Sequence, residues 1–207
     1  CTKYGYNARG EKDFTPESLR WSLGESLRRL RTDYVDILLL HNPPVDVIDE
    51  HHPIFVELEA LVRAGKTHAF GVSVDSSSDV LRAATRTKSH VVEVLYNAFH
   101  QEAAASFDAA AHRGIGLIAK VPLDSGWLGG RYGATARFTG VRNRWTPEDT
   151  RRRAVLVDEF RRIIGATIPI VHAALRFVLA RKEMSIAIPG VRDSAQLDAL
   201  RAATHAR

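Results

Sequence analysis

The sequence of 207 residues contains a single cysteine, Cys1, and a single methionine, Met184. One cysteine cannot form a disulfide within the chain, which excludes a disulfide-stabilised mini-protein and is typical of a reducing compartment. No run of apolar residues approaches the roughly 20 needed to cross a bilayer, and no signal peptide is recognisable. These features predict a cytoplasmic protein with no membrane partner.

The sequence also has little excess charge, with 29 basic and 24 acidic side chains and a net charge of +5. The basic residues alternate with acids, as where Arg161 and Arg162 follow Asp158 and Glu159. No basic patch interleaved with aromatic residues is present, so we expect no nucleic-acid partner. A basic pocket for a small phosphorylated ligand remains compatible with this charge.

Apolar residues make up 45% of the chain, which is typical of a globular protein, and we expect residues 1–207 to form one domain. Short β-branched runs predict buried strands at residues 35–40, 67–72, 91–95, 115–119 and 185–188. Helical spacing of apolar residues predicts helices at 16–30, 55–62, 80–84, 103–112, 147–164 and 170–179, and another after Asp193. Thr15-Pro16 and Thr146-Pro147 are N-cap and first-turn pairs.

The predicted strands begin near residues 35, 67, 91 and 115, at separations of 32, 24 and 24 residues. Repeated strand–helix units of this length indicate parallel strands joined by right-handed crossovers. An open doubly wound sheet and a (β/α)8 barrel both fit this pattern. No G-x-G-x-x-G follows a strand, so the sequence favours the barrel.

Residues 120–146 interrupt the strand–helix rhythm, because they contain five glycines and little periodicity. A segment of this length without periodicity is usually functional or mobile, and in a barrel it would lie on the catalytic rim. Trp127 and Trp145 lie in this segment, where they could line a substrate pocket or pack into a core. The adjacent His51 and His52 lack partner ligands, so we expect no metal site.

Polar residues follow the apolar strands at their carboxyl ends, a position that in a barrel converges on one face. They are Lys3, His41, Ser73, Asn97 and Lys120. A histidine after three leucines, at the same rim as a lysine and a serine, is a candidate for the chemistry of a site.

These motifs occur in the order found in the aldo-keto reductases, and the chain resembles that family over nearly its whole length. The matching pieces are Thr2-Lys3, Ser26-Leu27, Leu30, residues 32–36, 38–43, 65–66, 71–73 and 96–97, Pro122-Leu123, Gly126, Leu128, Gly130, residues 188–190 and Gln196-Leu197. The resemblance implies a (β/α)8 barrel and reduction of an aldehyde or ketone with NADP(H), with NAD(H) as the alternative cofactor. A small carbonyl or sugar-like compound would be the substrate.

The resemblance also implies a role for each matching residue. Lys3 and His41 match the lysine and histidine of the family's catalytic tetrad. Ser73 and Glu93 fall where the family binds the nicotinamide carboxamide, although glutamine is usual at the position of Glu93. Further cofactor contacts are implied at a pyrophosphate loop (Leu123, Asp124, Gly126, Leu128, Gly130) and at an adenosine-phosphate site (Gly190, Arg192, Ser194, Gln196). Lys120 is either a solvated lysine on the rim or a contact to phosphate or substrate.

Two members of the family's tetrad, an aspartate and a tyrosine, precede its lysine and have no match here. Tyr4 and Tyr6 come after Lys3 in the sequence, whereas the family's tyrosine precedes the lysine. We therefore do not expect either of them to replace it. The five strands and the tail of a sixth fall short of the eight of a barrel. We therefore expect an incomplete barrel, the later portion of a longer reductase. The alternative is a non-catalytic nucleotide-binding or interaction protein on a truncated barrel.

Overall fold

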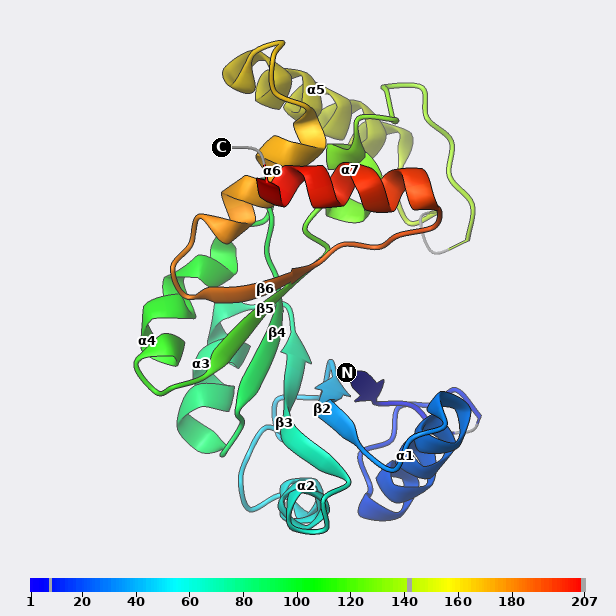
Figure 1. The fold of residues 1–207 in the computed structure, drawn as a ribbon, viewed down its shortest axis with the longest axis vertical. Helices are drawn as coiled ribbons and strands as arrows, with labels where there is room; N and C mark the ends of the chain where they lie inside the picture. The colour runs from blue at the N-terminus through cyan, green and yellow to red at the C-terminus, as the bar shows by residue number, and fades with distance from the viewer. Residues whose placement is uncertain (8, 141–142, 206–207) are drawn as a thin grey trace. The chain divides into compact units, whose positions relative to one another are not determined.

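The computed structural model describes residues 1–7, 9–140 and 143–205, which form six strands in one sheet (Figure 1). Neighbouring strands of the sheet are also consecutive in the sequence, from β1 at one edge to β6 at the other. They are β1 (Thr2–Tyr4), β2 (Val35–His41), β3 (Thr67–Val74), β4 (Val91–Leu95), β5 (Gly116–Lys120) and β6 (Met184–Ile188). The strands predicted from the sequence are confirmed, and so is the α/β fold of an incomplete barrel.

Helices alternate with these strands. The α-helices are α1 (Pro16–Leu30), α2 (Pro53–Arg63), α3 (Ser77–Arg86), α4 (Phe107–Ala111), α5 (Pro147–Ile164), α6 (Ile170–Leu179) and α7 (Ser194–His205). The 3₁₀ segments named in the described part of the chain are η1 (Glu102–Ser106) and η2 (Asp124–Gly129). No helix in the described part of the chain has both the length and the apolar character needed to cross a bilayer.

Two helix starts show local detail that the sequence did not predict. The helix expected over 103–112 begins as η1 and becomes α4 only at Phe107, and the Ser106 hydroxyl at this junction donates to the Ala103 carbonyl oxygen (2.6 Å). Helix α1 begins at Pro16 as predicted, but the Thr15 hydroxyl donates to Asp13 (2.7 Å) instead of capping the helix.

Helix α5 begins with a complete capping box. The Thr146 hydroxyl oxygen accepts from the Asp149 N–H (3.1 Å), and the Asp149 carboxylate accepts from the Thr146 N–H (3.0 Å). The Asp149 carboxylate also accepts from the Thr146 hydroxyl (2.8 Å), and this bond, with that from the Thr146 N–H, holds the pKa of Asp149 below its ordinary value. The start of α5 predicted from Thr146-Pro147 is confirmed.

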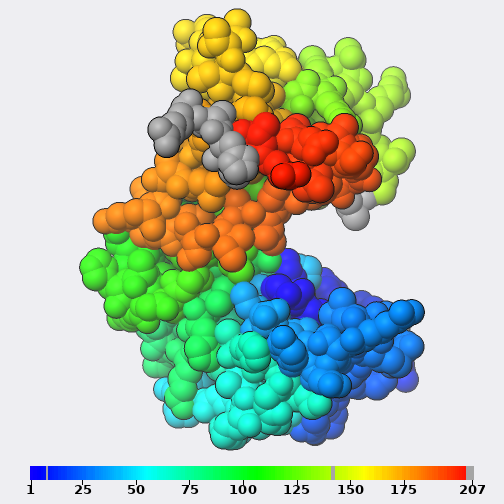
Figure 2. All heavy atoms as spheres, viewed as in Figure 1, coloured from blue at the N-terminus to red at the C-terminus, as the bar shows by residue number. Residues whose placement is uncertain are grey.

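The chain divides into two compact units, which are described separately. Unit 1 comprises Cys1–Leu95 and Glu102–Ile118, and unit 2 comprises Tyr96–Gln101 and Ala119–Arg207. Within unit 1, β1 to β4 pair in parallel, and α3 and α4 lie on one side of β4 (Figure 1). The blue to cyan segments, from β1 to β3, form one closely packed body in Figure 2.

Strands β3 and β4 approach each other closely at Gly71, the register partner of Val91. A Cβ atom built on Gly71 would lie 1.7 Å from the Val91 carbonyl oxygen. Only glycine therefore fits here. This close pairing fixes the register that aligns Ser73 with Glu93 two residues further along.

Unit 2 contains a small aromatic core in the segment for which the sequence showed no periodicity. Trp127 is fully buried and packs on Ala154 and Val157 of α5. The rings of Tyr132, Phe138 and Trp145 surround the Trp127 ring at centroid distances of 5.5, 5.6 and 5.9 Å. Trp127 is thus a core residue, and its aromatic neighbours give this part of the segment a defined fold.

Candidate active site

Four of the predicted site residues share one face of the sheet in unit 1. His41 on β2 is the register partner of Ser73 on β3, and Ser73 is the partner of Glu93 on β4. Lys3 on β1 pairs with Leu39, two residues before His41 and therefore on the same side of β2. Side chains alternate between faces along a strand, so Lys3, His41, Ser73 and Glu93 all project from one face.

An ion pair joins the first and last strand of this row. The Lys3 ammonium donates to Oε1 of Glu93, and the Ser73 hydroxyl donates to the same oxygen (2.8 Å). Two strands separate β1 from β4, so the contact requires the sheet to curl with this face on the inside. Sequence reasoning placed these residues near one another but did not foresee that Lys3 and Glu93 pair.

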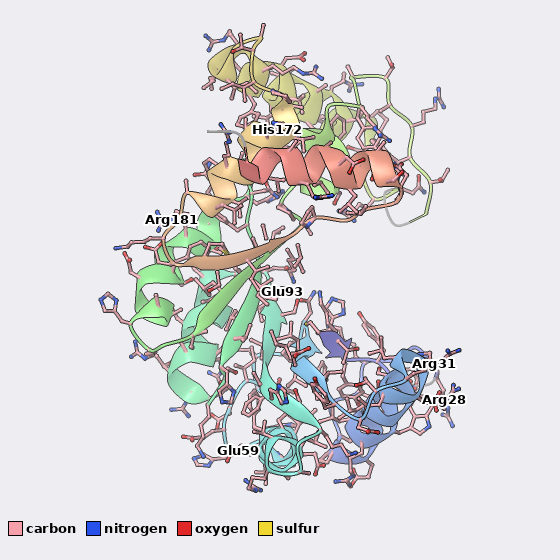
Figure 3. All side chains as sticks on the ribbon, viewed as in Figure 1. Arg28, Arg31, Glu59, Glu93, His172 and Arg181 are labelled. Atoms are coloured by element: carbon pink, nitrogen blue, oxygen red, sulfur yellow. The ribbon has the colours of Figure 1, made fainter. Side chains whose placement is uncertain are left out.

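The two members of the pair differ in their exposure to solvent. The Glu93 side chain is 1% exposed, whereas that of Lys3 is 33% exposed. Glu93 projects from β4, where it is labelled in Figure 3. Its second oxygen, Oε2, is buried and has no hydrogen-bond partner among the described residues. A buried carboxylate oxygen without a donor is costly, so this atom fits a ligand that brings an N–H group.

His41 ends β2 and is half-buried beside the loop that follows β1. The ring of Tyr6 meets the ring of His41 edge-on at a centroid distance of 6.1 Å. The backbone at Gly5 lies close to the backbone of His41. A Cβ atom on residue 5 would lie 2.8 Å from the His41 carbonyl oxygen, so glycine allows this close contact. Tyr6 remains 45% exposed and offers an aromatic surface next to the histidine.

The loop after β1 is fixed by its own hydrogen bonds. The Asn7 side-chain oxygen accepts from the N–H groups of Arg9 (2.9 Å) and Glu11 (3.1 Å). Lys12 donates from Nζ to the carbonyl oxygen of Asn42, which follows His41 (3.2 Å). These contacts tie the loop to the end of β2 and so hold Tyr6 at the histidine.

Tyr4 lies in the core of unit 1, where its ring meets Phe14 edge-on at 6.2 Å. It neighbours Lys3 in sequence and therefore projects from the opposite face of β1. Burial raises the pKa of Tyr4 to about 12. A buried phenol with this pKa on the wrong face does not fit the role of a proton donor beside Lys3.

In unit 2, Asp124 is held by two residues that sequence reasoning did not single out. Its buried carboxylate pairs with the Arg153 guanidinium, and its Oδ1 lies 3.3 Å from Nε2 of His100. The Arg153 guanidinium also lies over the Trp145 ring at 5.2 Å. In the sequence, the run of three arginines at 151–153 was the only sign of this ion pair. Arg151 and Arg152 are exposed, whereas Arg153 lies half-buried on the inner side of α5. The carboxylate of Asp124 thus anchors the loop, and its predicted cofactor contact remains a prediction.

The backbone around η2 is unusually rich in left-handed residues. Val121, Asp124, Ser125, Gly126 and Gly130 have φ values of 54°, 45°, 55°, 104° and 75°. Asp124, Ser125 and Gly126 are three left-handed residues in a row. The N–H groups of the loop at Asp124, Gly126, Leu128 and Gly130 already donate to carbonyl oxygens of the loop itself. The predicted pyrophosphate contact through backbone N–H groups stays a prediction, and it would require these groups to leave those bonds.

The side chains of the predicted pyrophosphate loop point elsewhere. Leu128 is fully buried, and Leu123 packs against Leu175 and Leu200. Contact of either leucine with a phosphate is therefore limited to its backbone. Lys120 ends β5 half-buried, and its carbonyl oxygen accepts from Tyr96 N–H (3.5 Å).

The predicted adenosine-phosphate residues gather at the start of α7, where Gly190, Arg192 and Ser194 are exposed. Asp193 accepts from the Gln196 N–H (2.8 Å), and the Gln196 side chain donates back to Asp193 (3.0 Å). Gln196 also accepts from the Arg192 N–H (3.2 Å). The chain's own carboxylate thus occupies the first turn of α7, and a phosphate would share that turn with it.

No three His, Cys, Asp or Glu side chains come close enough to hold a metal ion within residues 1–7, 9–140 and 143–205. Of the adjacent histidines, His51 is exposed, and His52 accepts through Nδ1 from the Ile54 N–H (3.3 Å) at the start of α2. His52 is thus a helix cap.

Comparison with known sequences decides the family. The Aldo/keto reductase family matches residues 1–207. The chain belongs to this family. Lys3 and His41 project from one face of adjacent strands, and the catalytic roles that the resemblance implies for them stay predictions.

Several curated relatives are similar to the chain. Human aflatoxin B1 aldehyde reductase member 2 is 30% identical over 199 residues, which cover 84% of this chain and 54% of that protein. Aldo-keto reductase yakc [NADP(+)] of Schizosaccharomyces pombe is 26% identical and covers 93% and 60%. D-threo-aldose 1-dehydrogenase of a Pseudomonas species is 32% identical over 124 residues and covers 58% and 38%. The chain therefore spans less than two thirds of these relatives.

Solved structures show the same fold. The holo form of aldo-keto reductase AKR11C1 from Bacillus halodurans superposes with a TM-score of 0.81 at 20% identity. The match covers all of this chain and 67% of that structure. The six-stranded sheet is thus part of an aldo-keto reductase barrel.

Proposed function

We propose that this protein interconverts a carbonyl compound and its alcohol, as an NADP(H)-linked aldo-keto reductase. The observation that carries the proposal is the row of Lys3, His41, Ser73 and Glu93 on one inward face of β1 to β4. Family membership over residues 1–207 supports the same reaction class. The single cysteine favours a reducing compartment, and the cytoplasmic location stays a prediction.

The chemistry requires a hydride on the carbonyl carbon and a proton on the carbonyl oxygen. In this proposal His41 donates a hydrogen bond to that oxygen and orients the substrate. The Lys3 ammonium lies on the same face and is bonded to Glu93, so part of its positive charge is neutralised before it can act on the reacting oxygen. Bound NADP(H) would supply or accept the hydride.

The proton donor is the part of the reaction that this chain does not explain. The resemblance assigns that role to a tyrosine, and buried Tyr4, with a pKa of about 12, does not fit it. We therefore expect the 207 residues alone to reduce aldehydes very slowly or not at all. This observation keeps the alternative open, namely a nucleotide-binding or interaction protein without turnover.

The residues of unit 1 fit the nicotinamide end of such a nucleotide. Glu93 Oε2 is a buried acceptor without a donor among the described residues, which suits the N–H group of a carboxamide. The NADP(+) in the name of the S. pombe relative favours the phosphorylated cofactor, with NAD(H) as the alternative.

Two observations support a proposal for the substrate class: the names of the relatives and the exposed ring of Tyr6. The named relatives act on an aldehyde and on an aldose. The exposed Tyr6 ring beside His41 offers a surface on which an apolar or sugar-like compound could pack. We propose a small carbonyl or sugar-like compound as the substrate.

The test measures nucleotide binding and turnover on the whole protein and on the 207-residue chain. NADPH binding is followed by ligand fluorescence, and turnover by NADPH absorbance with small aldehydes and aldoses. We expect both forms to bind NADPH and only the whole protein to turn over. In the whole protein we expect His41→Ala to lower kcat at least about 100-fold, since general acid–base and orienting residues contribute on this order.

His51→Ala is the matched control, because His51 is an exposed histidine of the same unit. It should leave turnover unchanged. Failure of both forms to bind either nucleotide would overturn the proposal. Binding by both forms, with no turnover by the whole protein on any carbonyl tested, would favour the non-catalytic alternative.

A further inference from the structure

Glu93 is the most deeply buried charged side chain of the site, and its two oxygens are used unequally. Oε1 accepts from both Lys3 and Ser73, whereas Oε2 has no hydrogen-bond partner among the described residues. A neutral glutamine could accept a hydrogen bond from a carboxamide equally well. The charge of Glu93 therefore calls for a separate explanation.

The charge of Glu93 is only partly cancelled within unit 1. Lys3 contacts Oε1, on one side of the carboxylate, and a third of its side chain is exposed to water. Water screens the lysine charge, whereas the carboxylate is 1% exposed and acts through a medium of low dielectric constant. A ligand group at Oε2 therefore experiences a net negative field.

The two redox forms of a nicotinamide nucleotide differ in the charge of the ring. The ring is cationic when oxidised and neutral when reduced, so a buried negative charge nearby stabilises the oxidised form. We propose that Glu93 selects the oxidised nucleotide and thereby biases the protein toward alcohol oxidation. This inference rests on the proposed function.

The reaction in this direction balances with NADP+ as the oxidant. The alcohol carbon loses a hydride to the nicotinamide ring, its C–H bond breaks, and the hydroxyl loses its proton to the medium through the site. The products are the carbonyl compound, NADPH and a proton. Lys3 and His41 would then hold the alcohol oxygen as its proton leaves.

The test compares the dissociation constants of NADP+ and NADPH, measured by calorimetry on the whole protein. In Glu93→Gln we expect the ratio Kd(NADP+)/Kd(NADPH) to rise about tenfold, because the cationic ring loses its partner while the neutral ring does not. Glu93→Asp keeps the charge and should keep the ratio within about threefold of wild type. Lys3→Met removes the opposing charge and should lower the ratio.

Glu59→Gln is the matched control, since Glu59 also pairs with a lysine, Lys88 (2.9 Å), but on the surface of unit 1 (Figure 3). It should leave the ratio unchanged. A wild-type ratio preserved in Glu93→Gln, with both nucleotides still bound, would overturn this inference and leave the proposed function standing. Binding of neither nucleotide by the wild type would overturn both. If Glu93→Gln does not fold, the wild-type ratio decides, and a wild-type protein that binds NADPH more tightly than NADP+ counts against the inference.

Discussion

The Lys3 ammonium is bonded to the Glu93 carboxylate, although two strands of the sheet lie between them. The pair is asymmetric, because Glu93 is buried and Lys3 is partly solvated. Each partner therefore depends on the other to a different degree. Glu93 without Lys3 would be a buried charge beside one hydroxyl, whereas Lys3 without Glu93 could reach water.

This asymmetry predicts unequal effects on the free energy of unfolding. Lys3→Met should lower it by about 3 kcal/mol, because a buried charge loses its partner, and Glu93→Gln by about 1 kcal/mol or less. The double variant should lose less than the sum of the two. Urea unfolding at pH 7 measures all three. Equal costs that add in the double variant would show that the two side chains are not coupled.

The strands that carry this pair could be predicted from sequence, but the pair itself could not. Alternating and continuous apolar runs end at Lys3, His41 and Ser73, so local periodicity located the face. Lys3 and Glu93 are 90 residues apart, and their contact depends on how strongly the sheet curls. No local pattern encodes that curvature.

The segment from η2 to α5 shows the same limit. Its aromatic residues, Trp127, Tyr132, Phe138 and Trp145, follow no helical or strand period, so the sequence suggested a functional or mobile loop. The structure gives them a shared core whose contacts depend on α5. The cofactor contact implied for Asp124 stays a prediction. Its ion pair with Arg153, 29 residues away, cannot be read from the neighbours of either residue.

Two glycines of unit 1 should respond in opposite ways to alanine. Gly71→Ala should prevent soluble expression or cost at least about 3 kcal/mol, because the new Cβ would overlap the Val91 carbonyl oxygen. Gly24→Ala lies within α1, with no atom near the new Cβ, and should stabilise by about 0.5–1 kcal/mol. Thermal unfolding of both variants measures the contrast. A Gly71→Ala protein of normal stability would contradict the close pairing of β3 and β4.

Tyr4 should make the protein lose stability at alkaline pH. Its pKa is about 12 in the folded chain, whereas an unfolded tyrosine titrates near about 10. The stabilisation is therefore complete below pH 10 and is lost as the pH rises toward 12, by up to about 2–3 kcal/mol. Tyr4→Phe should flatten this part of the pH profile of urea unfolding, and Tyr6→Phe, which changes an exposed ring, should not. Parallel profiles for wild type and Tyr4→Phe would contradict the burial of this phenol.

Arg153 should control the order of the loop that begins at η2. Arg153→Ala leaves the Asp124 carboxylate buried without its cation and removes a cation from the face of Trp145, so we expect a loss of about 2–4 kcal/mol. Limited proteolysis within residues 124–146 should become faster by at least about tenfold, and affinity for NADPH should fall with it.

Arg152→Ala is the matched control, because Arg152 is an exposed neighbour on the same helix. Asp124→Asn should cost less than Arg153→Ala, since asparagine tolerates the left-handed φ of 45° and its side-chain oxygen can still accept from Arg153, whose side chain is 19% exposed. Equal proteolysis of Arg153→Ala and Arg152→Ala would show that the ion pair does not hold the loop.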